Sequence, residues 1–201
     1  AAERLARLGY VLGRVVVVDN ASDDQTADVA RMGGAEVVWC GVRGYGSACL
    51  AGIEALRDDP PRALCFMDAD GADDPRDLLT LLTPLSRGAE LVIGSRVRLA
   101  EPGALTPVQR FGNALSCALL KVGFDLEQTD LGPFRVILWP ALDDLKMADP
   151  NFGWTVEMQA KAARARLSVA EVSVRYRPRR AGVSKVSGQL KGSALAGYKI
   201  L

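Results

Sequence analysis

Two aspartates one residue apart, Asp68 and Asp70, stand directly after the apolar residues 64–67 and before Gly71. Paired carboxylates are hard oxygen ligands of the kind that Mg²⁺ and Mn²⁺ prefer, and these metals bridge phosphate groups. Aspartate is also common in turns, so the spacing alone is weak support. The position adds support, because α/β sheets bind ligands beyond the carboxyl ends of their strands. Asp68-Ala69-Asp70 is therefore predicted to hold a divalent cation, Mg²⁺ or Mn²⁺, and a phosphate-bearing ligand.

The chain contains no histidine, which excludes Ser-His-Asp and Cys-His catalysis. Acid, base and metal chemistry must then depend mainly on aspartate and glutamate. The four cysteines form no CxxC pair, so neither a zinc site nor a thioredoxin-like motif is indicated. We expect all four to be buried thiols in a reducing compartment. They are Cys40, Cys49, Cys65 and Cys117.

Two other acidic groups flank predicted elements. Asp19 follows a run of four valines at residues 15–18, where a strand would end. Asp73 and Asp74 precede Pro75, and this order is typical of a helix cap with proline at the first helical position.

Alternating strands and helices must position these side chains. The valine run reads as a fully buried parallel strand, because it is apolar throughout. Alternation with this spacing predicts an α/β fold, with a mostly parallel sheet flanked by helices on both faces. Further strands are expected at 36–39, 63–67 and 90–93, and helices at 23–32, 46–57 and 75–85.

The second half of the chain is less regular. Helices are expected near 107–121 and 154–166, with a turn-rich segment at 130–135 between them. An alternating strand at 169–176 should place Val172, Val174 and Tyr176 on one side. Since no internal repeat or low-complexity linker interrupts the pattern, residues 1–201 are assigned to one domain.

The C-terminal part is basic. Residues 172–201 contain seven Lys and Arg residues and no acid, so residues 1–171 sum to −6 within a net charge of +1. A basic, amphipathic segment from about residue 177 favours a phosphate-bearing ligand or an anionic membrane surface, although a solvated basic face is the alternative. No apolar run approaches the roughly 20 residues that cross a bilayer, and no signal peptide is visible.

Several motifs together resemble glycosyltransferase family 2, in particular the dolichyl-phosphate-mannose synthase type and its bacterial polyprenyl-phosphate relatives. The resemblance covers nearly the whole chain in the expected order, and it implies a GT-A fold and an inverting transfer from a nucleoside diphosphate sugar. The motifs are residues 18–26, Gly44-Tyr45-Gly46, Asp68-Ala69-Asp70-Gly71, Gly94-Ser95-Arg96, residues 129–135 and Gly182-Val183-Ser184-Lys185.

The resemblance also implies roles for single residues. It places Asp19 at the nucleoside, and Asp68-Ala69-Asp70 around the ribose, the diphosphate and the metal. Arg96 is similar to the arginines that face donor or acceptor phosphates.

Four further basic residues complete this set. Arg110 resembles a second phosphate-facing arginine, although Arg96 and Arg110 also fit solvent-exposed structural positions. Arg179, Arg180 and Lys185 resemble a mobile basic loop that closes over the diphosphate. Independently, metal, Arg and Lys stabilise the charge that a leaving diphosphate gains in the transition state.

Two departures from the family pattern stand out. The family's first strand has no counterpart, because residues 1–13 read as the helix after it, so the chain is expected to be truncated or partly ordered there. Ala72 occupies the place of a glutamine that serves as a further metal ligand in the mannose synthases. Asp73 or water would have to substitute for it.

The acceptor decides the role of Asp130. A hydroxyl acceptor needs a general base, and Asp130 is the first candidate. A lipid phosphate is already ionised, and Asp130 would then only position phosphate-binding groups. Glu157 lies in the same helix as Trp154 and fits either a functional role or a surface ion pair.

The leading interpretation is transfer of a hexose from a UDP- or GDP-sugar to a polyprenyl phosphate, with peripheral membrane contact at the inner, cytoplasmic face. The alternatives are transfer to a hydroxyl of a glycan or small molecule, and a nucleotide-binding module without turnover. A Rossmann dehydrogenase is a poor fit, since no G-x-G-x-x-G follows a strand. Nucleic acid is not expected as a partner, because the basic segment has few interleaved aromatic residues.

Overall fold

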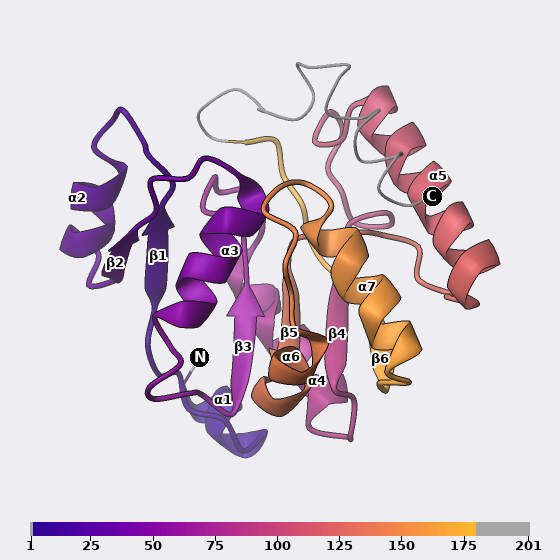
Figure 1. The fold of residues 1–201 in the computed structure, drawn as a ribbon, viewed down its shortest axis with the longest axis horizontal. Helices are drawn as coiled ribbons and strands as arrows, with labels where there is room; N and C mark the ends of the chain where they lie inside the picture. Colours follow the sequence, from indigo (N-terminus) through magenta and orange to yellow (C-terminus); the bar gives the residue numbers. More distant parts are fainter. Residues whose placement is uncertain (1, 180–201) are drawn as a thin grey trace.

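The computed structural model of the chain describes residues 2–179. Helices and strands alternate through the first half, as the hydrophobic pattern predicts (Figure 1). The elements are, in order, α1 (Ala2–Arg7), β1 (Val16–Asp19), α2 (Thr26–Met32), β2 (Glu36–Trp39), α3 (Tyr45–Glu54), β3 (Ala63–Phe66), the 3-10 helix η1 (Pro75–Asp77), α4 (Leu78–Leu85), β4 (Leu91–Ser95), α5 (Pro107–Phe124), β5 (Arg135–Leu138), α6 (Trp139–Leu145), α7 (Trp154–Arg164) and β6 (Val169–Ser173).

The strands form two hydrogen-bonded groups. β1 and β2 pair in parallel, and β3, β5, β4 and β6 form a four-stranded sheet in that order. β4 and β6 are parallel, whereas β5 runs antiparallel to both β3 and β4. β3, β4 and β6 therefore share one direction, with β5 inserted between them, and the predicted α/β class is confirmed.

Helices cover both faces of the four-stranded sheet, and alternate side chains of β4 serve the two sides. Leu91 and Ile93 pack against α3, α6 and α7, while Val92 packs against α4. All five residues of β4 are buried, as a strand between two helical layers requires. Figure 1 shows α3, α6 and α7 in front of the sheet and α5 along one side of the molecule.

The first strand differs from its prediction. We expected residues 15–18 to be fully buried, but Val16–Val18 are half-buried and Val15 is 49% exposed. The reason is the pairing, because among the described residues β1 bonds to a strand on one side only. The cysteine prediction was also too general. Cys40 alone is buried, and Cys65 in β3 is exposed.

Two elements that were not predicted follow the turn-rich segment. β5 begins at Arg135, and α6 follows it without a break. Gly132 brings the preceding turn against β4, because a Cβ at this position would collide with the Gly94 carbonyl oxygen. This close approach fixes the turn beside the end of β4. Among the described helices, none is long and apolar enough to cross a membrane.

Candidate functional site

Side chains from several strand ends meet at one edge of the four-stranded sheet. Ser95, at the end of β4, lies 3.1 Å from Thr129 in the turn before β5 (Oγ to Oγ1). Residues beyond β6 reach the loop after β3, since Tyr176 forms a β-bridge with Asp73. The structure thus brings together the segments that carry Asp68, Arg96 and Asp130.

The aspartate run after β3 folds into a compact turn. The Oδ1 atom of Asp70 accepts a hydrogen bond from the Ala72 amide at 2.9 Å, and Gly71 adopts a positive φ of 77°. The Oδ2 atom of Asp70 forms an ion pair with Arg179 Nε at 2.8 Å. Arg179, the first residue of the basic loop expected over the diphosphate, therefore lies beside the aspartate run.

Asp73 is a third acidic residue in contact with the Asp68–Asp70 turn. Its side chain is 3% exposed, its Oδ2 accepts a hydrogen bond from the Asp68 amide at 3.3 Å, and its Oδ1 is buried without a hydrogen-bond partner. Burial, followed by the nearby Asp68 charge, raises the pKa of Asp73 to about 7. Burial and then Asp70 raise the pKa of Asp68 as well. Simultaneous ionisation of Asp68 and Asp73 is therefore disfavoured.

Asp130 and Arg96 form the tightest ion pair of the site. Asp130 is 1% exposed, and its carboxylate accepts bonds from the Arg96 amide (2.7 Å), Nε (2.8 Å) and Nη2 (2.7 Å). The Arg96 guanidinium also lies 5.1 Å from the centre of the Tyr176 ring, within cation–π range. Burial opposes the charge on Arg96, but the bonds to Asp130 outweigh it and raise the Arg96 pKa.

Three residues that the sequence analysis did not select hold the turn around Asp130. Glu171 of β6 accepts bonds from the Thr129 and Asp130 amides, at 2.7 and 3.2 Å. Asn113 of α5 bonds to the Thr129 carbonyl and the Leu131 amide, both at 2.9 Å. Gln159 of α7 donates to the Asp130 carbonyl at 3.0 Å. The signal in the sequence was a polar residue within each of the expected helices and the expected strand.

Arg135 supports the same turn from within the core. It is fully buried, and its guanidinium donates to the carbonyl oxygens of Leu131, Gly132 and Thr155. Burial lowers its pKa to about 10. Arg135 is therefore a buried cation that contacts backbone carbonyl oxygens and no carboxylate among the described residues, and its bonds hold the Gly132 turn next to Asp130.

Asp19 lies at the end of β1, as predicted. Its Oδ1 accepts the Ser22 amide at 2.9 Å, and this bond together with the Ser22 side chain lowers the Asp19 pKa. The neighbouring Asn20 donates to the Val42 carbonyl at 2.7 Å and accepts from the Gly44 amide at 2.8 Å. Asn20 therefore ties the loop between β2 and α3 to the end of β1.

Other selected residues are placed differently. Arg110 is exposed on α5, and no hydrogen bond or ion pair joins it to another predicted site residue in the described part of the chain. Glu157 accepts bonds from the Ala148 and Asp149 amides and pairs with Lys161 at 2.7 Å, so the ion pair that was one of its two interpretations is present. Arg180 and Lys185, with the rest of the C-terminal segment beyond Arg179, lie outside the described residues.

Comparison with known proteins assigns a family to this arrangement. The family model described as glycosyl transferase family 2 matches residues 3–130. The chain belongs to glycosyltransferase family 2. An uncharacterised glycosyltransferase of Mycobacterium tuberculosis strain H37Rv is 41% identical over 184 residues, which cover 91% of this chain and 82% of the relative.

Two relatives of this glycosyltransferase carry more specific names. The undecaprenyl-phosphate mannosyltransferase of Micrococcus luteus is 31% identical, over 90% of this chain and 79% of its own. The polyprenol monophosphomannose synthase of Mycolicibacterium smegmatis is 30% identical, over 87% of this chain and 70% of its own. The resemblance stated from the motifs is therefore confirmed at the level of the family.

A solved structure identifies the fold. The glucosyl-3-phosphoglycerate synthase of Mycobacterium tuberculosis, in complex with Mn²⁺, UDP-glucose and phosphoglyceric acid, superposes with a TM-score of 0.71 at 20% identity. The match covers 99% of this chain and 71% of that chain. The GT-A fold predicted for this glycosyltransferase is confirmed.

The donor set of the glycosyltransferase fits a divalent cation. Asp68 and Asp70 supply two carboxylates one residue apart, and the Asp70 charge contributes to the raised pKa of Asp68. Asp73 adds a third acidic group whose pKa is also raised. A divalent cation would relieve this repulsion. Within residues 2–179, no three acidic or sulfur side chains are arranged to hold a metal by themselves. Asp68 and Asp70 are the residues that would hold such a cation, together with ligands from the substrate or water.

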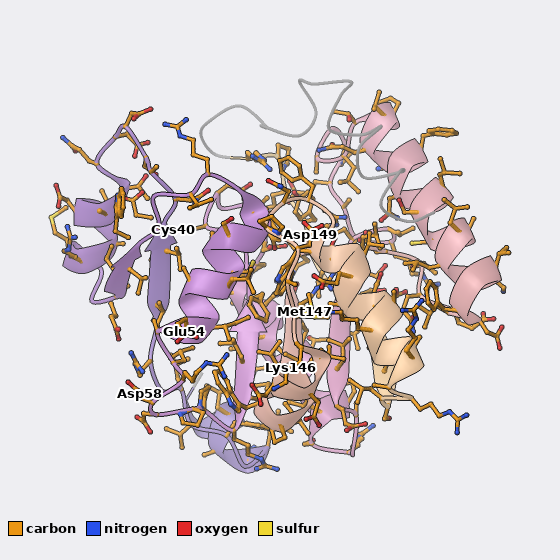
Figure 2. The ribbon with its side chains drawn as sticks, viewed as in Figure 1. Cys40, Glu54, Asp58, Lys146, Met147 and Asp149 are labelled. Carbon is orange, nitrogen blue, oxygen red and sulfur yellow. The ribbon has the colours of Figure 1, made fainter. Side chains whose placement is uncertain are left out.

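A separate hollow of about 510 Å³ lies between α3 and α6. Figure 2 labels Glu54, Lys146 and Met147 on its rim, and Asp149 near the beginning of α3. Its charged side chains pair with one another, since Arg57 binds Glu54 at 2.8 Å and Asp143 at 3.0 Å. The predicted catalytic residues do not line it.

Part of the basic segment is used within the fold of the glycosyltransferase. Arg177 binds Asp74 at 2.6 Å, and Arg175 binds Asp77 through its Nη2. Asp74 also caps η1 through the Arg76 amide, which confirms the predicted cap. All seven basic residues of 172–201 were expected to be available for a ligand or a membrane. Arg175 and Arg177 are instead paired with acidic residues of η1 and its cap, because the chain after β6 passes beside η1.

These ion pairs predict a pH dependence of stability. The Arg76 hydrogen bond lowers the pKa of Asp74, and Arg175 acts in the same direction. A carboxyl group whose folded-state pKa is depressed stabilises the protein above its unfolded pKa of about 3.9 and loses this contribution as the pH falls. We expect Asp74→Asn, which keeps the cap, to reduce stability near neutral pH and to show a shallower decline toward about pH 3.

Urea unfolding of the wild type and Asp74→Asn across this pH range measures the difference. The matched control is Asp58→Asn, at an exposed position. Parallel pH profiles for the wild type and Asp74→Asn would show that the ion pairs contribute nothing.

Proposed function

We propose that this glycosyltransferase transfers a hexose, with inversion, from a UDP- or GDP-sugar to a polyprenyl phosphate. In this proposal residues 1–201 form one catalytic domain that makes peripheral contact with the cytoplasmic face of a membrane. Mg²⁺ or Mn²⁺ is the cofactor, held by Asp68 and Asp70.

The ion pair between Asp130 and Arg96 is the observation that favours a phosphate acceptor. A base for a hydroxyl acceptor must offer a carboxylate oxygen to the proton that it removes. The Asp130 carboxylate is 1% exposed and already accepts three bonds from Arg96. A phosphate acceptor arrives ionised and needs no base, so this geometry supports it. The names of the relatives from Micrococcus luteus and Mycolicibacterium smegmatis are consistent with the same acceptor class.

The chain's own residues then divide into donor and acceptor groups. Asp19 binds the nucleoside, and Asp68-Ala69-Asp70 lies at the ribose and diphosphate. When bound, the metal supplies positive charge that stabilises the leaving diphosphate. Arg96, oriented by Asp130 and the Tyr176 ring, faces the acceptor phosphate.

The remaining basic residues complete the proposal. Arg110 contributes a second charge on the acceptor side. Arg179, Arg180 and Lys185 contribute charge on the diphosphate side, where Arg179 is already within 2.8 Å of Asp70. Positive groups at both ends of the transferred sugar match the charges of a diphosphate and a monophosphate.

A screen of nucleotide sugars with Mg²⁺ or Mn²⁺ tests the proposal. We expect release of UDP or GDP only when a short polyprenyl phosphate is present, because the acceptor phosphate is the nucleophile. Turnover with a glycan or small-molecule hydroxyl and none with polyprenyl phosphate would favour the hydroxyl acceptor. Metal-dependent nucleotide binding without turnover on any acceptor would indicate a binding module.

A further inference from the structure

A line of exposed apolar side chains runs along α5. The side chains of Val108, Phe111, Leu115 and Val122 are 60%, 69%, 47% and 88% exposed. Their spacings of three, four and seven residues place them within an arc of roughly 60° at 3.6 residues per turn. We call these four residues the α5 stripe. Scattered exposed apolar residues are ordinary, but an aligned set on one long helix indicates an interaction surface.

The opposite side of α5 holds the helix on the domain. Leu120 is the buried residue of this helix, and the α7 residue Arg164 lies 5.3 Å from the Phe124 ring. Figure 1 shows α5 along one side of the molecule, away from β1 and β2. The α5 stripe therefore faces outward, while the inner face packs toward α7.

Basic side chains flank the α5 stripe. Arg110 is exposed and lies two residues after Val108. Lys121 precedes Val122, and its side chain is 59% exposed and pairs with Glu127 at 3.0 Å. By helical geometry both lie on the same flank of the stripe. An apolar face with Lys and Arg beside it is the pattern of a helix that lies in the interface of an anionic membrane, where long basic side chains reach the head groups.

α5 is also tied to the candidate site. Asn113 lies between Phe111 and Leu115 in the sequence, and it bonds to both sides of the turn that contains Asp130. A membrane surface that binds α5 therefore also holds the Asp130 turn, on the acceptor side of the site, close to that surface. This link distinguishes α5 from the other exposed apolar residues, such as Val29 and Met32 on α2.

We propose that the α5 stripe inserts into the interface of an anionic lipid membrane and holds the Asp130 side of the site against it. The role of this contact in catalysis rests on the proposed function, since a polyprenyl phosphate keeps its chain in the lipid and its head group at the surface. The surface itself is defined by α5 alone.

Vesicle co-sedimentation of the full chain tests the surface. Vesicles of phosphatidylcholine alone are compared with vesicles that also contain phosphatidylglycerol. We expect the double variant Phe111→Glu/Leu115→Glu to lower the partition coefficient on anionic vesicles at least about tenfold, because two inserted apolar groups become two repelled charges. The matched control, Val29→Glu/Met32→Glu on α2, should stay near the wild type. Equal losses in both double variants, or none in either, would overturn the inference.

Two further measurements separate the alternatives. If a second copy covers the α5 stripe, light scattering will give a dimer mass for the wild type and a monomer mass for the α5 variant, and the inference fails. Turnover on a water-soluble short-chain polyprenyl phosphate should be the same in the α5 variant and the wild type, whereas turnover on acceptor embedded in vesicles should fall. If the wild type turns over no polyprenyl phosphate at all, the proposed function fails while vesicle binding still decides the surface.

Discussion

Replacing Asp70 with alanine is expected to abolish the metal dependence of donor binding and to reduce turnover by about 100-fold or more. Metal stabilisation of a leaving diphosphate is worth several kcal/mol, and each 1.36 kcal/mol corresponds to a factor of about ten in rate. Asp70 contributes one of the two carboxylates of the proposed metal site, and its Oδ2 points toward Arg179. Loss of this group leaves the diphosphate charge less compensated.

Calorimetry of UDP- or GDP-sugar binding, with and without Mn²⁺, measures the effect directly. Because Asp70 also closes the turn through the Ala72 amide, Asp70→Asn is included, since it keeps an acceptor at that position and removes only the charge. Asp58→Asn, at an exposed position, serves as the control. Unchanged Mn²⁺-dependent affinity in both Asp70 variants would remove Asp70 from the metal site.

The second large effect concerns the ion pair of Asp130 and Arg96. Asp130→Ala is expected to lower the free energy of unfolding by about 3–5 kcal/mol, because it leaves a nearly buried guanidinium without its partner. Asp130→Asn keeps one acceptor oxygen and should cost less. If the acceptor is a phosphate, Asp130→Asn at saturating donor should reduce turnover only modestly.

A double-mutant cycle with Arg96→Gln distinguishes positioning from catalysis. If Asp130 acts through Arg96, the double variant Asp130→Asn/Arg96→Gln should be no worse than the more severe single variant. A folded Asp130→Asn protein with a loss of about 10²- to 10⁴-fold, and no coupling to Arg96, would instead identify Asp130 as a general base for a hydroxyl acceptor. Urea unfolding of each variant separates lost stability from lost chemistry.

Local pattern was sufficient for much of the fold. β2 has the bounds expected from residues 36–39, and α5 and α7 appear where the apolar periodicity placed them. β5 was missed because it follows directly on the Gly132 turn and begins with Arg135, a charged residue whose burial no periodicity indicates. β1 is less buried than its apolar sequence predicts, since burial depends on neighbours that the strand itself does not specify.

The candidate site divides in the same way. Asp68 and Asp70 were accessible to sequence reasoning because their spacing and their place after a strand carry chemical meaning. The bond between Asp74 and Arg177 joins residues 103 positions apart, and no local pattern encodes that meeting. The engagement of Asp130 by Arg96, which favours positioning over base catalysis, likewise required the three-dimensional arrangement.

The ion pair between Arg179 and Asp70 makes the guanidinium and an incoming cation rivals for one carboxylate oxygen. A cation that took this oxygen would displace Arg179, and the stability of the ion pair would then lower the affinity for the cation. The pair is partly exposed and therefore contributes about 1 kcal/mol or less, so it would lower the affinity for the cation a few-fold. This effect weakens as salt is added. A displaced Arg179 is then available to an anion such as a diphosphate. Cation and diphosphate would consequently bind with positive cooperativity, each raising the affinity for the other by the same factor.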